Sequence, residues 1–122
     1  MQPDCLILYV HSPAESVLFY RSLLGREPVE QSPNFAMFML NDRTMLGLWA
    51  AHDVQPAGGQ RGGGAEIGIT VATDIEVQAA CAAWKTAGWP VLQAPTTMDF
   101  GYTAVTADHD GHRVRVFRPT QG

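Results

Sequence analysis

The chain contains the stretch Leu6-Ile7-Leu8-Tyr9-Val10, followed by Ser12-Pro13-Ala14-Glu15. The same pattern of residue types returns 61 residues later, as Ile67-Gly68-Ile69-Thr70-Val71 followed by Thr73-Asp74-Ile75-Glu76. In both copies an apolar run typical of a strand precedes a capping box. A capping box is a hydroxyl residue with a carboxylate three residues later, and it satisfies free amides at the start of a helix. The shared offset of strand and cap indicates that the two halves of the chain fold alike.

Each capping box predicts a helix that ends at a glycine, because glycine adopts the left-handed conformation common at helix ends. The predicted helices cover residues 13–24, before Gly25, and residues 74–87, before Gly88. Three strand candidates follow each helix: 28–31, 35–40 and 45–50 in the first half, and 91–93, 102–107 and 113–117 in the second. The order is strand, helix and three strands, twice, which predicts an α+β fold of tandem βαβββ modules.

The glycine-rich segment 58–65 lacks apolar periodicity and is predicted to be a linker within a single domain of 1–122. Module one then covers residues 1–57, and module two covers residues 66–122. A βαβββ module has one sheet face covered by its helix and the other face bare. Two modules placed edge to edge are therefore expected to form a curved mixed sheet whose inner face is a ligand cleft.

Composition and charge exclude several classes of partner. The net charge is −4 and Lys85 is the only lysine, so no basic surface is expected for nucleic acid or for an anionic membrane. No apolar run approaches the roughly 18 residues that span a bilayer. The first residues lack the basic segment of a signal peptide, and two cysteines do not make a disulfide framework. A cytoplasmic protein is expected.

Several segments carry a resemblance to a known family. They are Phe19-Tyr20-Arg21 before Leu23-Leu24-Gly25, the paired modules, and Asp108-His109-Asp110-Gly111-His112 before the last strand. Together they resemble the vicinal-oxygen-chelate superfamily of glyoxalases, bleomycin resistance proteins and extradiol dioxygenases. The resemblance covers essentially the whole chain, and it implies the vicinal-oxygen-chelate fold and a homodimer.

Within that superfamily, the nearest likeness is to the branch that includes phenazine-antibiotic-binding resistance proteins. The segments that carry it are Glu27-Pro28-Val29, Leu48-Trp49, Glu66-Ile67-Gly68-Ile69 and Asp99-Phe100-Gly101-Tyr102-Thr103.

The resemblance also implies where the superfamily's enzymes place a metal: on four inward strand positions, which here are Cys5, Gly47, Glu66 and Arg115. Gly47 has no side chain, and Arg115 is a permanent cation that repels a divalent ion. Cys5 and Glu66 alone would hold zinc only weakly. We therefore expect no metal, no other cofactor and no catalytic residue.

Aromatic and soft side chains are the candidates for the lining of the cleft. Trp49 shares strand parity with Gly47, whose missing side chain is expected to leave a gap for a planar ring. Phe35 and Phe38 have opposite parity, and Phe38 is predicted to face inward. The other candidate ligand-binding residues are Met98, Phe100 and Tyr102 at the border, and Cys5, Ile7 and Tyr9 as the floor.

Two interpretations of Arg115 remain open from the sequence. In one, the guanidinium forms an ion pair with Glu66. In the other, Arg115 binds a carboxylate of the ligand through two parallel hydrogen bonds.

The function predicted from these residues is non-catalytic binding and sequestration of a planar aromatic small molecule, in the manner of a drug-resistance protein. One alternative is a metal-dependent glyoxalase-type lyase or extradiol-type dioxygenase. Another is a metal-free enzyme that uses Glu66 as a base.

Overall fold

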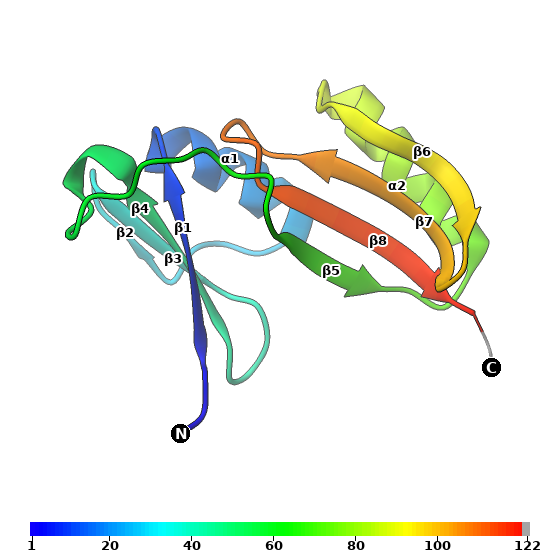
Figure 1. Ribbon diagram of the computed structural model, residues 1–122, viewed down its shortest axis with the longest axis horizontal. Helices are drawn as coiled ribbons and strands as arrows, with labels where there is room; N and C mark the ends of the chain where they lie inside the picture. Colours follow the sequence, from blue (N-terminus) through cyan, green and yellow to red (C-terminus); the bar gives the residue numbers. More distant parts are fainter. Residues whose placement is uncertain (121–122) are drawn as a thin grey trace. The chain divides into compact units, whose positions relative to one another are not determined.

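A computed structural model describes residues 1–120 and divides the chain into two compact units, Met1–Arg61 and Gly62–Gly122 (Figure 1). The boundary falls within the glycine-rich segment 58–65. The amide of Gly62 donates to the carbonyl of Asp110 at 3.0 Å. The chain is therefore already hydrogen-bonded to its own unit at the first residue of the second unit.

The first unit is a four-stranded sheet with one helix. Its strands lie in the order β1-β4-β3-β2, with β1 parallel to β4 and the other neighbours antiparallel. The elements in chain order are β1 Cys5–Val10, α1 Pro13–Leu24, β2 Glu30–Gln31, β3 Phe35–Met39, β4 Met45–Ala50 and the short 3-10 helix η1 Ala51–Asp53.

The second unit repeats this topology. Its strands lie in the order β5-β8-β7-β6, with β5 parallel to β8 and the other neighbours antiparallel. The elements are β5 Glu66–Thr70, α2 Asp74–Ala87, β6 Val91–Met98, β7 Gly101–Ala107 and β8 Arg113–Pro119. The predicted α+β class and the doubled βαβββ order are confirmed.

Both predicted helices are confirmed at both ends. The hydroxyls of Ser12 and Thr73 accept from amides three residues later, at 3.3 Å and 3.2 Å. Gly25 and Gly88 end the helices with φ of 65° and 81°, in the left-handed region. The local signals at each end were sufficient because capping depends on neighbouring residues alone.

The strand ends show one larger departure from the prediction. Strand β6 continues to Met98, whereas the sequence predicted an end at residue 93. Pro95 lies within it, and a proline is tolerated there because β6 is an edge strand. The register of β6 against β7 also shifts on both sides of Gln93. Its side chains therefore do not follow the regular apolar–polar alternation by which a strand is predicted from sequence.

In the first unit, α1 packs on β3 and β4 and buries one face of the sheet. The central side chains on that face are fully buried: Val10, Ala36, Phe38, Leu46, Leu48 and Ala50, together with Val17 and Tyr20 from α1. Strand side chains alternate between faces, so the intervening residues lie on the face opposite α1.

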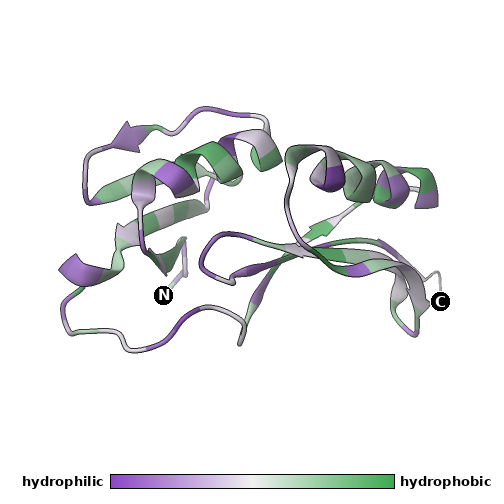
Figure 2. Cartoon of the chain, turned by 90° about the horizontal axis from the view of Figure 1, so that it is seen from above, coloured by the Kyte–Doolittle hydropathy of each residue, from purple (hydrophilic) through white to green (hydrophobic). Residues whose placement is uncertain are grey.

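In the second unit, α2 packs on β6, β7 and β8. Its core joins Val77, Cys81 and Trp84 of the helix to Ala104 and Val116 of the sheet. Figure 2 shows both helices with hydrophilic and hydrophobic bands side by side, as expected for helices with one buried face. Among residues 1–120, no helix is long and apolar enough to cross a membrane.

Candidate functional site: two open sheet faces

The first open face is the side of the first sheet opposite α1, and it carries Ile7, Tyr9, Phe35, Gly47 and Trp49. The strand register places them together, because Ile7 pairs with Gly47, Tyr9 with Trp49, and Phe35 also with Trp49. Paired residues in a sheet project to the same side. Cys5 lies two residues before Ile7 on β1, so it is on this face too, and it is exposed.

Trp49 is held in place from two sides. Its indole Nε1 donates to Oδ2 of Asp53 at 3.2 Å, and its ring meets Tyr9 edge to face with 6.3 Å between centroids. The backbone at Gly58 lies against the ring of Tyr9, since a Cβ added at Gly58 would be 2.7 Å from Cδ2 of Tyr9. Trp49 remains half-buried, so a rigid aromatic surface is available on this face.

The structure corrects the prediction for Phe38. Phe38 pairs with Leu46, is fully buried and lies on the face covered by α1. Phe35 is the phenylalanine that lies on the first open face. Parity alone could not choose between them, because the choice depends on which face the helix covers.

The expected gap at Gly47 is also corrected. A Cβ added at Gly47 would lie 3.0 Å from Cζ of Phe35 and 3.4 Å from Cγ1 of Ile7. The ring of Phe35 therefore already occupies the space over the glycine. The missing side chain accommodates a residue of the protein itself.

The second open face is the side of the second sheet opposite α2. Strand register places on it Glu66, Gln93, Met98, Thr103, Arg115 and Phe117, and Phe100 joins it through its contacts with Arg115 and Phe117. Arg115 is the centre of its polar contacts. Its Nε donates to Oε1 of Glu66 at 2.6 Å, and its Nη1 donates to Gln93 Oε1 at 3.1 Å and to Thr103 Oγ1 at 3.2 Å. Of the two interpretations of Arg115, the ion pair with Glu66 is therefore present.

Aromatic rings border this arginine. Cζ of Arg115 lies 5.4 Å from the ring centroid of Phe100, within cation–π range. Phe100 meets Phe117 edge to face at 5.8 Å between centroids, and 44% of Phe100 is exposed. Met98 is also exposed, and its sulfur accepts from Gln93 Nε2 at 3.3 Å. Met98 and Phe100 are thus exposed side chains on this face.

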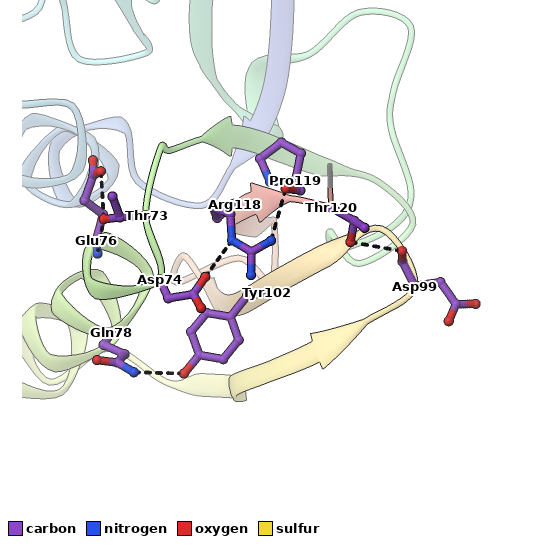
Figure 3. Close-up of polar contacts among 9 residues, drawn as sticks. All are labelled: Thr73, Asp74, Glu76, Gln78, Asp99, Tyr102, Arg118, Pro119 and Thr120. Atoms are coloured by element: carbon purple, nitrogen blue, oxygen red, sulfur yellow. Dashed lines mark hydrogen bonds and ion pairs between the residues drawn. The ribbon is translucent and has the colours of Figure 1, made fainter. Parts of the chain in front are cut away.

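The prediction for Tyr102 is wrong. Tyr102 pairs with Arg118 on the α2 side of the sheet and packs against the core there. Its hydroxyl oxygen accepts from Nε2 of Gln78 on α2 at 3.2 Å, and Arg118 Nε donates to Asp74 Oδ1 at 2.6 Å (Figure 3). That hydrogen bond raises the pKa of the Arg118 guanidinium. Tyr102 therefore ties the sheet to its helix.

Cys5, Gly47, Glu66 and Arg115, the four positions that the resemblance implied for metal ligands, do not offer the donors that a metal ion needs. Gly47 lies under the ring of Phe35, and Arg115 is bound to Glu66. Glycine has no side chain that could ligate a metal, and a guanidinium has no lone pair to donate to one. Within residues 1–120, no three His, Cys, Asp or Glu side chains gather closely enough to hold a metal ion.

Comparison with known proteins identifies the family of this chain. The sequence profile of the glyoxalase/bleomycin resistance protein/dioxygenase superfamily matches residues 2–116. The chain belongs to this superfamily. The phenazine antibiotic resistance protein EhpR of Enterobacter agglomerans is 30% identical over 117 residues, which cover 93% of this chain and 89% of EhpR.

Solved structures share this fold. The solution structure of protein ATC0852 from Agrobacterium tumefaciens is 45% identical, with a TM-score of 0.90 and 99% of each chain covered. A glyoxalase-related enzyme from Fulvimarina pelagi shares the fold at 23% identity, with a TM-score of 0.86 over 97% of this chain and 88% of that chain.

Sequence reasoning missed several residues of the open faces of this superfamily member. Phe117 lies two residues after Arg115 on one strand, so shared parity would have found it. Gln93 and Thr103 reach Arg115 only through the register of β6, β7 and β8. That register includes the shift at Gln93, for which the sequence has no visible signal.

The contact between Gly47 and Phe35 generates a stability prediction. Gly47→Ala should lower the free energy of unfolding by about 1 kcal/mol, because the new methyl group displaces the Phe35 ring. In a Phe35→Leu background the same change should be close to neutral. Urea denaturation of the four proteins measures both values.

Gly68→Ala is the matched control, because a Cβ at Gly68 would make an ordinary contact of 3.6 Å with Phe117. It should leave stability unchanged or slightly raised. An equal loss from Gly47→Ala in both backgrounds would contradict the assigned contact.

Proposed function

We propose that this protein binds and sequesters a planar aromatic small molecule, an antibiotic or a related metabolite, without transforming it. The observation that carries the proposal is the first open face, where Tyr9, Phe35 and Trp49 present aromatic rings on the side that α1 leaves uncovered. Flat aromatic ligands bind such surfaces by apolar burial and offset or edge-to-face ring contacts.

The relationship to EhpR supports the choice of ligand class. EhpR is a phenazine antibiotic resistance protein, and this chain is similar to it over most of both sequences. Binding alone is sufficient for resistance, because a sequestered antibiotic is withdrawn from its target. The chemistry at Gly47 and Arg115 supports a binding role over a metal-dependent reaction, since neither residue can ligate a metal.

Trp49 tests this proposal directly. A titration with phenazines and other polycyclic aromatics should quench tryptophan fluorescence in the natural protein. Trp49→Ala should remove most of the quenching and weaken binding about tenfold or more, because the ring contact is lost. Calorimetry measures the affinity, and chromatography of the recovered ligand should show it chemically unchanged.

Leu18→Ala is the control, because Leu18 is 62% exposed on α1, which packs on the other face of the sheet. Binding by that variant should be unaltered. Absence of quenching by every compound, or equal quenching in the Trp49→Ala variant, would count against the proposal, and a chemically altered ligand would indicate an enzyme.

We also propose that the protein is a homodimer that acts in the cytoplasm. Strand β1 is an edge strand, and three of its large apolar side chains, Leu6, Ile7 and Tyr9, are 41–44% exposed. Exposed apolar edge strands favour association. Both cysteines, Cys5 and Cys81, are unpaired, which is typical of a reducing compartment.

Light scattering tests the dimer. The natural protein should have twice its chain mass of 13.3 kDa at micromolar concentration. Leu6→Lys should shift it toward the monomer, because a charge on an edge strand opposes pairing. Leu18→Lys, on the exposed side of α1, should leave the mass unchanged. A monomeric natural protein would contradict the proposal.

A further inference from the structure

The hydrogen bonds of Arg115 leave one part of its guanidinium free. Nε bonds to Glu66, and Nη1 bonds to Gln93 and Thr103, which uses both hydrogens of that nitrogen. Across residues 1–120, Nη2 has no hydrogen-bond partner. Nη2 is therefore the nitrogen of this guanidinium that remains as a donor for a molecule that reaches this face.

The guanidinium is fixed before any ligand arrives. Its side chain is only 18% exposed, three groups orient its plane, and the ring of Phe100 lies at 5.4 Å. A donor held in this way binds without the loss of rotamer entropy that a free arginine incurs. The exposed ring of Phe100 beside it offers contact to an aromatic ligand at the same place.

The charge of this cluster favours one kind of acceptor. The carboxylate of Glu66 lies 2.6 Å from Nε and already neutralises the arginine. A second carboxylate on a ligand would meet that first one at short range, and the whole chain carries a net charge of −4. A carbonyl, amide or ring-nitrogen acceptor incurs no such repulsion.

We propose that Nη2 of Arg115 donates a hydrogen bond to an uncharged acceptor on a planar aromatic ligand at the second open face, and that Glu66 makes this site select against carboxylates. This inference rests on the proposed function and adds to it the class of ligand: planar aromatics with a neutral carbonyl or ring nitrogen. Arg115 supplies the donor, and Glu66 acts as the selectivity residue.

The test compares two probes with the same ring system, phenazine-1-carboxamide and phenazine-1-carboxylate, by calorimetry at pH 7.5. The natural protein should bind the amide at least about tenfold more tightly. In Glu66→Gln, whose amide oxygen still accepts from Nε, affinity for the carboxylate should rise about tenfold while affinity for the amide stays within about threefold.

Glu76→Gln is the matched control. It removes the same charge from α2, which covers the other face of this unit, and glutamine also serves at that position of a capping box. It should leave the ratio of the two affinities unchanged. Arg115→Lys, with folding checked by circular dichroism, should weaken binding of the amide about tenfold, because the Nη2 donors are lost.

The outcomes separate this inference from the function on which it rests. Binding of both probes with equal affinity, preference of the natural protein for the carboxylate, or an unchanged ratio in Glu66→Gln would overturn the inference and leave sequestration standing. Failure of the natural protein to bind either probe would overturn both.

Discussion

Burial of one face of each sheet under its own helix is the constraint on which the rest of this structure depends. Strand side chains alternate, so a helix that buries Leu46 and Leu48 necessarily assigns Gly47 and Trp49 to the other side. A slip of one residue in register would exchange the core with the open face. The fold and the proposed binding face thus depend on the same alternation.

The two units use this constraint with different side chains. The first open face is aromatic and apolar, with Trp49 fixed by Asp53 and Tyr9. On the second open face, Arg115 is bonded to three polar side chains and bordered by Phe100. The two open faces therefore differ in chemistry: the first presents aromatic rings, and the second presents an oriented guanidinium beside an exposed phenylalanine.

The limits of sequence reasoning follow from the range of each interaction. Helix ends depend on residues a few positions apart, so Ser12 and Gly25 were sufficient to place α1. Orientation across a sheet depends on long-range register, and there the sequence failed for Phe38 and Tyr102. The contact of Gly47 with Phe35 was equally hidden, because a missing side chain does not show what fills its space.

The central proposal to test is that an aromatic ligand binds to the sheet faces opposite the helices. Nuclear magnetic resonance of isotope-labelled protein, with and without a bound phenazine, tests this most directly. We expect the signals of the Trp49 indole N–H and the Arg115 side-chain N–H to shift on binding, while those of residues facing α1 and α2 stay in place. Shifts confined to the helix-covered faces, with the Trp49 and Arg115 signals unmoved, would contradict it.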